Sequence, residues 1–559
     1  MSHPWFSSYP DQVPHEIDIN EYKSVVDVFE QSFSKFKNNP SFTCMGKTYT
    51  YGELDNLSKK FASYLQNDLK LSKASRVALM MPNILQYPIA LFGILRAGLI
   101  AVNVNPLYTE RELEHQLNDA SVDAIVIFAN SAHILQKVLP KTKVKHVMVT
   151  QIGDLLSFPK SLLVNFVIKN VKKMVPAWDI PSHINFNDTL AIGDESKFKK
   201  QDVGHDDIAF LQYTGGTTGV AKGAVLTHKN IIANMLQARS WIGSGIEPGK
   251  EIIITPLPLY HIFSLTANCL VFCSVGAQNI LITNPRDFNG FVKELSKWKF
   301  TAITGVNTLY NALLNNDAFR NLDFSALKLS LGGGTAVQRS VAERWKEVTG
   351  IVLIEAYGLT ETSPAACMNP LNMSEFNGMI GLPISSTIVK VLDDDGNELA
   401  QGETGEIAIK GPQVMQGYYN RPEDTAAVMT SDGFFKTGDI GIMDEKGYFK
   451  IVDRKKDMVL VSGFNVYPNE VEDAIVGHEG ILEVAAIGVP SEKSGEAVKI
   501  FVVRTDKNLT ESDIVEYAKT VLTGYKVPKI VEFREELPKT PVGKILRKDL
   551  RNEDLSKKA

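Results

Sequence analysis

A loop rich in glycine and threonine carries the strongest chemical signal in the sequence. It runs Tyr213-Thr214-Gly215-Gly216-Thr217-Thr218-Gly219, follows the apolar stretch Ile208–Leu211 and ends close to Lys222. Glycines let a backbone approach a polyphosphate closely, and backbone N–H groups, hydroxyls and a lysine ammonium can solvate phosphate oxygens. The pattern GxxxxGK[ST] of a Walker A loop occurs nowhere in the chain. We therefore expect a phosphate-binding loop of another type.

Five further blocks combine charged, aromatic or flexible residues. They are Gly332-Gly333-Gly334, Tyr357-Gly358-Leu359-Thr360-Glu361-Thr362, Thr437-Gly438-Asp439, Asp453-Arg454-Lys455-Lys456-Asp457 and Pro541-Val542-Gly543-Lys544-Ile545. Taken alone, each has an ordinary structural explanation. Single residues such as Glu361 and Lys544 usually lie on the surface, a glycine run suits a tight strand exit, and a charge run is usually a solvated loop. Only the combination of blocks points to one site.

The elements that must position these blocks are strands and helices in alternation. This pattern predicts an α/β architecture with largely parallel sheets over the first three quarters of the chain. The expected strands there are Arg76–Met81, Ala124–Phe128, Glu251–Thr255, Asn279–Ile282, Thr301–Thr304, Leu327–Leu331 and Val352–Glu355, with helices such as Tyr51–Asp68 and Asp287–Trp298 between them. From Thr387 onward, short strands separated by turns (Ile388–Leu392, Glu406–Lys410, Tyr448–Val452) predict a β-rich subdomain. Strands Val484–Val489 and Val498–Val503 and a helix over Glu511–Leu522 predict a further α/β unit at the end.

Bulk composition excludes several classes of protein. The 559 residues carry a net charge of −5 and a pI near 6.1, which argues against a nucleic-acid binder. The four cysteines are scattered, so neither a disulfide framework nor a zinc site is indicated, and a reducing cytosol fits best. No secretory signal opens the chain. The longest apolar stretch, Ile84–Val104, is interrupted by Arg96 and predicts a helix running into a strand. We expect a soluble, cytoplasmic protein.

In their order along the chain, the blocks resemble the signatures of the acyl-adenylate-forming superfamily, which includes acyl-CoA synthetases, luciferases and the adenylation domains of peptide synthetases. The resemblance extends from about residue 25 to 550. It is strongest to the bacterial long-chain fatty-acid–CoA ligase branch, on Asp453–Glu470, Gly305–Asn315 and Leu522–Lys529. Ala221 stands where many relatives have proline before the loop lysine, and it is similar to that branch there.

The resemblance implies a fold, a division into domains and a reaction. It implies a large N-terminal α/β domain (residues 1–452, with the β-rich subdomain at 387–452), a hinge at 453–457 and a small mobile α/β lid domain at 458–559. The implied enzyme is an ATP-dependent ligase that forms an acyl-adenylate and pyrophosphate from a fatty acid and ATP. It then transfers the acyl group to CoA and releases AMP. The substrates would be a fatty acid, ATP and CoA, with Mg²⁺ as cofactor.

The same resemblance assigns roles around the nucleotide. Thr214, Thr217, Thr218 and Lys222 would hold the β- and γ-phosphates. Glu361, with Thr214, would bind Mg²⁺, which prefers oxygen ligands, and Thr360 would contact the α-phosphate. Adenine would lie between Gly332–Gly334 and Tyr357, and Asp439 and Arg454 would bind the ribose. Lys544 would bridge the substrate carboxylate and the α-phosphate, where it offsets negative charge as the bond forms.

Thioester formation and acid binding add further residues. Lys544 would leave when the lid rotates about Asp453; Gly463 would line the pantetheine tunnel, and Tyr525 and Lys526 would lie near the nucleotide end of CoA. His261 resembles a residue bordering the acyl site, although a lone histidine is more often structural. The wall Thr304–Tyr310 contains no basic residue, which favours an apolar acid over an amino acid.

The segment Leu162–Val175 has apolar residues at helical spacing, with Lys169, Lys172 and Lys173 on the complementary side. Two interpretations stay open: a helix packed on the protein's own core, or a basic amphipathic helix on the anionic inner face of the cell membrane. A homodimer is common among relatives, and nothing in the sequence demonstrates one.

Three alternatives to the fatty-acid assignment also stay open. One is an adenylate-forming ligase for medium-chain or aryl acids. Another is a luciferase or a peptide-synthetase module, although no carrier domain follows in this sequence. The third is a nucleotide-binding relative without turnover, against which every motif position with a catalytic role is filled. A kinase is excluded by the lack of its signature motifs.

Overall fold

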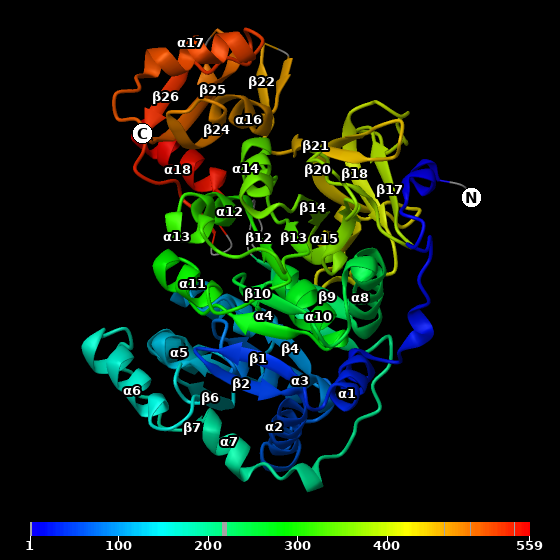
Figure 1. Ribbon diagram of the computed structural model, residues 1–559, viewed down its shortest axis with the longest axis vertical. Coiled ribbons are helices and arrows are strands. Elements are labelled where there is room, and N and C mark those ends of the chain that lie inside the picture. The colour runs from blue at the N-terminus through cyan, green and yellow to red at the C-terminus, as the bar shows by residue number, and fades with distance from the viewer. Residues whose placement is uncertain (1–2, 215–220, 463, 492, 541–542, 559) are drawn as a thin grey trace.

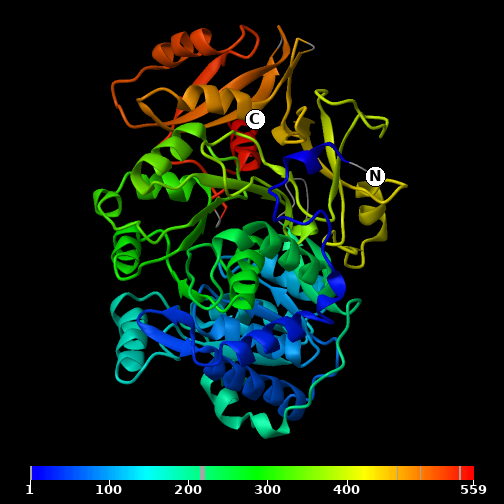
Figure 2. The ribbon, with the colours of Figure 1, turned by 45° about the vertical axis from the view of Figure 1, so that its right-hand side comes forward.

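The computed structural model describes residues 3–214, 221–462, 464–491, 493–540 and 543–558. The C-terminal unit lies at one end of the long axis, and the residues from α1 (Val25–Lys35) to α7 (Phe186–Ile192) lie at the other, in both views of the ribbon (Figures 1 and 2). The residues between them, which carry most of the candidate site, occupy the middle of the molecule.

An eight-stranded sheet forms the lower part of the molecule in Figure 1. In spatial order its strands are β19 (Gly417–Tyr418), β9 (Lys222–Thr227), β8 (Ile208–Thr214), β4 (Ile100–Asn103), β3 (Arg76–Met80), β5 (Ala124–Phe128), β6 (His146–Thr150) and β7 (His183–Asn185). The strands from β8 to β7 are parallel, whereas β9 and β19 are added antiparallel at one edge.

A nine-stranded sheet lies beside it. Its strands are, in spatial order, β16 (Leu382–Pro383), β15 (Ala365–Met368), β14 (Leu353–Gly358), β13 (Leu329–Gly332), β12 (Ala302–Gly305), β10 (Ile252–Thr255), β11 (Gln278–Leu281), β1 (Pro40–Cys44) and β2 (Lys47–Thr50). The strands from β14 to β1 are parallel. The prediction of an α/β fold with largely parallel sheets is therefore confirmed.

Alternation along the strands explains why both faces of the eight-stranded sheet are buried. In β3, Val77 and Leu79 belong to the large core shared with the nine-stranded sheet, and Ala78 and Met80 belong to a second core on the opposite face. Successive side chains point to opposite faces of a strand, so a continuous apolar run is what a parallel strand covered on both sides requires.

Helices cover and separate the two sheets. They are α1 (Val25–Lys35), α2 (Tyr51–Ser63), α3 (Gln86–Arg96), α4 (Glu110–Asp119), α5 (Ala132–Val138), α7 (Phe186–Ile192), α8 (His228–Ile242), α11 (Phe288–Leu295), α12 (Asn307–Leu314), α13 (Asp317–Arg320) and α14 (Arg339–Thr349). Every residue of α3 is buried, and β4 follows it, as the stretch Ile84–Val104 predicted. Among the described residues, no helix is long and apolar enough to span a bilayer.

Strands β17 (Ile388–Leu392), β18 (Gly405–Lys410), β20 (Phe435–Met443) and β21 (Phe449–Arg454) form a four-stranded antiparallel sheet, as the β-rich prediction required. The N-terminal segment runs along its flank (Figure 2). Trp5 is buried there against Phe449, with ring centroids 6.2 Å apart. The chain's beginning therefore ties the β-rich sheet to the body.

The C-terminal unit has a sheet and two apolar cores of its own. It contains β22 (Val459–Val461), β23 (Phe464–Val466), β24 (Ile481–Ser491), β25 (Gly495–Arg504) and β26 (Ile530–Phe533), with helices α16 (Pro468–Val476), α17 (Glu511–Val521) and α18 (Arg547–Lys558). Its cores contain residues from Val459 onward. This agrees with a unit that begins after the charged block, and the exact hinge at 453–457 stays a prediction.

Candidate functional site

The two ends of the phosphate loop are held together by the β8–β9 ladder. Thr214 closes β8 and lies opposite Lys222, the first residue of β9. The loop members Gly215, Gly216, Thr217, Thr218 and Gly219 lie outside the described residues. Tyr213, just before them, is buried and its hydroxyl donates to Asp119 Oδ2 at 2.7 Å. A pair of hydrogen-bonded strands therefore presents the predicted loop at a sheet edge.

Lys222 lies among groups that the motifs did not indicate. Its ammonium donates to Asp424 Oδ1 at 2.5 Å and lies 5.3 Å from the centre of the Tyr418 ring. Asp424 belongs to α15 (Pro422–Val428), directly after β19. Lys222, the cation predicted to bind phosphate, is thus paired with a partly exposed carboxylate that a polyanionic ligand can displace.

Glu361 lies in a short helical turn after β14 and is only 8% exposed. Its Oε1 accepts a hydrogen bond of 2.8 Å from the Tyr418 hydroxyl. Burial raises the pKa of Glu361, and the hydrogen bond from Tyr418 opposes that shift. Thr360 precedes it in the same turn and is half-buried.

The glycine run and the ribose residues converge from three strands. Gly332 closes β13, where a Cβ atom would come within 2.7 Å of side-chain carbons of Leu353 and Val337 and would force them to move. Tyr357, near the end of β14, donates to Asp439 Oδ2 at 2.6 Å. Arg454 Nε forms an ion pair with the other oxygen, Oδ1, at 2.8 Å.

The pairing of Asp439 and Arg454 is set by strand register. The two residues are directly opposite each other in β20 and β21. One carboxylate oxygen of Asp439 accepts the Tyr357 hydrogen bond and the other pairs with Arg454, and a carboxylate has about four lone-pair sites. It therefore keeps capacity for two hydroxyl donors, which suits a ribose.

Lys544 reaches this centre from the C-terminal unit. Burial, with the nearby Arg454 cation, lowers the pKa of Lys544 to about 8. Gly543 before it adopts φ +83°, and its carbonyl accepts from Thr308 Oγ1 at 3.4 Å. Burial, with the Lys544 charge, lowers the pKa of His261 to about 4. A lysine whose pKa is lowered by burial and by a neighbouring cation is stabilised in its charged form when an anion binds beside it.

The acid-pocket residues lie on facing elements. His261 caps the short helix α9 (Ile262–Ser264), its Nδ1 accepting from the backbone N–H of Phe263 at 3.3 Å. The helix continues with π-type hydrogen bonding over Leu265–Val271, a geometry frequent at functional sites. The predicted wall Thr304–Tyr310 is the end of β12 and the start of α12.

The charged block at the predicted hinge is tied to α18. Asp453 is fully buried and accepts from the backbone of Asn469 at 2.7 Å, and the Arg547 guanidinium lies 3.6 Å from it. Arg547 also pairs with Glu472 at 2.7 Å and Asp457 at 3.4 Å. Gly463 lies outside the described residues. Lys526 pairs with Glu470 of α16 at 2.6 Å.

Sequence reasoning missed Tyr418, Asp424 and Arg547. The segment Gly417-Tyr418-Tyr419-Asn420-Arg421-Pro422-Glu423-Asp424 has no composition that separates it from a loop followed by a short helix. A proline just inside a helix start does predict α15. The role of Tyr418 depends on the pairing of β19 with β9, residues almost two hundred positions away, and no local pattern reports such a pairing.

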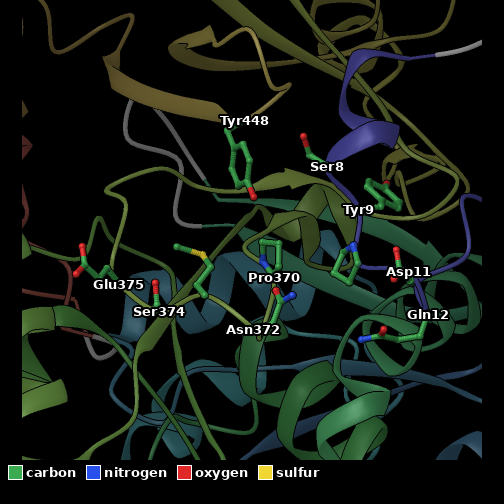
Figure 3. Close-up of a pocket in the computed structure, with 11 residues that line it drawn as sticks. Ser8, Tyr9, Asp11, Gln12, Pro370, Asn372, Ser374, Glu375 and Tyr448 are labelled. Carbon is green, nitrogen blue, oxygen red and sulfur yellow. The ribbon is translucent and has the colours of Figure 1, made fainter.

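A cavity of about 530 Å³ lies apart from this centre. Figure 3 shows Ser8 and Tyr9 of the N-terminal segment on one side, Tyr448 above, and Pro370, Asn372 and Ser374 opposite. None of the predicted site residues lines it. It is a seam between the N-terminal segment and the body.

The donor atoms fit a Mg²⁺ ion that arrives with a nucleotide. Glu361 and Thr214 offer oxygen ligands, the kind that Mg²⁺ prefers. Within the described ranges, no cluster of three or more His, Cys, Asp or Glu side chains could hold a metal ion. Mg²⁺ commonly binds through one or two carboxylates and the substrate's phosphates, which matches a single buried Glu361.

Comparison with known proteins agrees with this geometry. Residues 29–419 match the model of the AMP-binding enzyme family, and residues 470–544 match its C-terminal domain. The chain is 57% identical over 553 residues to a long-chain-fatty-acid–CoA ligase of Escherichia coli O157:H7, covering 99% of this chain and 98% of that one. It is 54% identical to the ligase of the same name from Haemophilus influenzae, with both chains covered in full.

Solved structures give the same fold. ATP-bound MatB from Rhodopseudomonas palustris superimposes with a TM-score of 0.81 at 28% identity, covering 94% of this chain and 98% of that one. An anthranilate CoA ligase in complex with anthranoyl-AMP superimposes with a TM-score of 0.86 at 23% identity, covering 97% and 100%. With a family model matched over most of the chain and relatives above 50% identity along its full length, the chain belongs to the AMP-binding enzyme family.

Proposed function

We propose that this protein is a long-chain fatty-acid–CoA ligase that acts through an acyl-adenylate. The observation that carries the proposal is the position of Lys544. It comes from the C-terminal unit, yet Gly543 beside it accepts from Thr308 of the predicted acid-pocket wall, and its charge interacts with Arg454, Asp439 and His261. A cation between a nucleotide pocket and an acid pocket is what the joining of two anions requires. Full-length similarity to ligases of this name supports the substrate class.

In the first step, a carboxylate oxygen of the fatty acid bonds to the α-phosphorus of ATP, and pyrophosphate leaves. Lys222 and the loop hydroxyls bind the β- and γ-phosphates and stabilise the leaving charge. Lys544 donates to the carboxylate and the α-phosphate as they approach, and Asp439 with Arg454 fixes the ribose. Glu361 would hold Mg²⁺, which would supply further positive charge beside the phosphates.

In the second step, the thiol sulfur of CoA attacks the acyl carbonyl carbon, AMP leaves and the thiol proton passes to solvent or a base. Because Lys544 occupies the approach to the acyl carbon in the first step, it has to withdraw. Asp453, buried beside Arg547 between the β-rich sheet and the C-terminal unit, is our hinge candidate. Gly463 and Lys526 are assigned to CoA on resemblance alone.

The test is ATP–pyrophosphate exchange with acids from acetate to oleate, followed by thioester formation with CoA. We expect exchange to be strongest with acids of long chain, because each buried methylene adds about 0.8 kcal/mol. Exchange with aromatic or short acids would keep the adenylation step and overturn the substrate class. ATP binding without exchange on any acid would support a non-catalytic relative.

We also propose that the segment Phe158–Met174 contacts an anionic membrane surface. It forms α6 (Lys160–Phe166) and a π-type turn over Val167–Val171, and neither buries a residue. The large apolar side chains exposed along it are Phe158 (81%), Leu162 (64%), Leu163 (62%), Phe166 (58%), Val171 (65%) and Met174 (52%). Val164, Val167 and Ile168 are half-buried, so a helix packed on the protein's own core stays the alternative interpretation.

Charge complementarity favours an anionic bilayer as the occupant of this surface. Lys169, Lys172 and Lys173 are exposed beside the apolar side chains, and the segment from Ser157 to Val175 contains no acidic residue. An amphipathic helix with lysines at its edge lies with its apolar face in the headgroup region. The segment projects from the lower left of the molecule, clear of the site (Figure 1).

Vesicle co-sedimentation tests this surface. We expect binding to phosphatidylglycerol-containing vesicles and little to pure phosphatidylcholine. A Lys169/Lys172/Lys173→Glu variant should lose most of that binding, because each lysine near the surface contributes about 1 kcal/mol. The matched control is Lys493/Lys507/Lys519→Glu, which reverses three exposed charges in the C-terminal unit. Equal binding by both variants would overturn the assignment.

A further inference from the structure

The strand β19 is a two-residue addition at the edge of the eight-stranded sheet, and it lies beside the start of β9. Tyr418 is opposite Ala224, and the Tyr419 N–H donates to the Gly223 carbonyl at 2.8 Å. The backbone N–H of Tyr418 donates to Thr425 Oγ1 at 2.9 Å. The pairing of Tyr418 with β9 and its hydrogen bond to Thr425 of α15 therefore fix the position of the Tyr418 backbone.

The Tyr418 side chain touches both predicted charged groups of the phosphate site. Its hydroxyl donates to Glu361 Oε1 at 2.8 Å, and its ring centre lies 5.3 Å from the Lys222 ammonium. A cation within about 6 Å of an aromatic face is attracted by it. One rigid side chain thus relates an anion in the turn after β14 of the nine-stranded sheet to a cation on β9 of the eight-stranded sheet.

Glu361 has further support from the same segment. The N–H of Met415, three residues before Tyr418, donates to the Glu361 carbonyl at 2.7 Å. Backbone and side chain of Glu361 are therefore both held by the run that ends in β19. Because the Tyr418 hydroxyl donates to Oε1, the Glu361 carboxylate has a defined orientation. Hydrogen bonds that orient a metal-binding carboxylate commonly increase metal affinity.

We propose that Tyr418 is a positioning residue of the nucleotide–metal site: its hydroxyl orients the Glu361 carboxylate toward Mg²⁺, and its ring face holds Lys222 beside the phosphate loop. The inference rests on the proposed function, since it assumes that this site binds ATP with Mg²⁺. It assigns to Tyr418 no contact with the reacting atoms.

Two substitutions separate the hydroxyl from the ring. Tyr418→Phe keeps the ring and removes the hydrogen bond, and we expect the Mg²⁺ concentration for half-maximal ATP–pyrophosphate exchange to rise about tenfold, as for loss of a hydrogen bond to a charged group. The KM for fatty acid should stay within twofold. Tyr418→Leu should in addition raise the KM for ATP at saturating Mg²⁺. Tyr419→Phe, the same change one residue on, is the control and should behave as the wild type.

A binding measurement completes the test without turnover. Calorimetric titration of a non-hydrolysable ATP analogue at several Mg²⁺ concentrations should show a weakened Mg²⁺ dependence of affinity for Tyr418→Phe alone. An unchanged dependence in a variant with wild-type thermal stability would overturn the inference. A wild-type protein that shows no exchange with any acid would instead overturn the proposed function, and the binding titration would still decide the role of Tyr418.

Discussion

The two lysines assigned to the reaction are held in different ways. Lys222 belongs to a sheet edge, where its strand is hydrogen-bonded on both sides and its ammonium has a ring and a carboxylate as neighbours. Lys544 lies on a loop of the C-terminal unit, and the described contacts of that loop with the body include a hydrogen bond of 3.4 Å from Thr308. The difference suggests that Lys222, which binds phosphate, is fixed in the sheet. Lys544, which acts in the first chemical step, belongs to an element that can move away.

The largest expected effect concerns Lys544. Lys544→Ala should lower the rate of acyl-adenylate formation by about a hundredfold to a thousandfold, the usual cost of losing one group that stabilises transition-state charge. Thioester formation from supplied acyl-adenylate and CoA should change by less than threefold. Comparable loss in both half-reactions would contradict the division between the two lysines. Lys548→Ala, exposed four residues later, serves as the control.

The next prediction concerns the junction on which Lys544 depends. Arg547→Met should destabilise the C-terminal unit by about 3 kcal/mol, because removing one member of a buried ion cluster leaves charges without a partner. Asp453, Asp457 and Glu472 all lie within 4 Å of its guanidinium. Thermal unfolding followed by limited proteolysis would show the loss first in fragments from residue 458 onward. Uniform destabilisation of both units would argue against a separate lid.

Much of the framework could be predicted from the sequence because its signals are local. Ala124–Phe128 and Ile388–Leu392 form strands with the predicted bounds, since apolar alternation and flanking turns are encoded within each segment. Others shift by one to three residues: the strand expected at Leu327–Leu331 is Leu329–Gly332, and the helix expected at Asp287–Trp298 is Phe288–Leu295. Strand and helix ends depend on caps and neighbours more than on periodicity.

The candidate site divides in the same way. Asp439, Arg454, Tyr357 and Lys544 were indicated by short blocks, and the structure brings them together. Tyr418 and Arg547 were not, because their partners are distant in sequence and a tyrosine or arginine has many ordinary surroundings. The exposure of Phe158–Met174 was also not decidable from spacing, since a buried and a lipid-facing amphipathic helix share one period.

A third prediction uses pH to probe the contact between the two regions. Burial raises the pKa of Glu355, at β14, to about 8, with a smaller contribution from Asp473 of α16, whose own pKa burial raises to about 6. A carboxyl group whose pKa is higher in the folded than in the unfolded protein contributes stability that is fully present below the pKa of the unfolded state, near 4.5. That contribution is lost as the pH rises through the pKa of the folded state. Stability should therefore fall between about pH 5 and pH 8.

Glu355→Gln should remove much of this decline. The amide oxygen can still accept from the Val337 N–H, now at 3.2 Å from Glu355 Oε1, and no charge forms at high pH. We expect the variant to be about 1–2 kcal/mol more stable than the wild type at pH 8 and similar at pH 5. Thermal melts across pH 5–8.5 measure this, with the exposed Glu343→Gln as control. Parallel curves for Glu355→Gln and the wild type would exclude the carboxyl as the cause.

The smallest expected effect concerns Lys222. In the absence of nucleotide, Lys222 is paired with Asp424, whose side chain is 39% exposed. A partly exposed pair of this kind contributes up to about 1 kcal/mol, and ATP has to displace it. Asp424→Asn should therefore lower the KM for ATP by about twofold to fivefold while leaving the KM for fatty acid unchanged, which steady-state kinetics at saturating Mg²⁺ would measure. A higher KM for ATP would mean that Asp424 holds Lys222 in its working position, and that the sheet edge positions this lysine only with the help of α15.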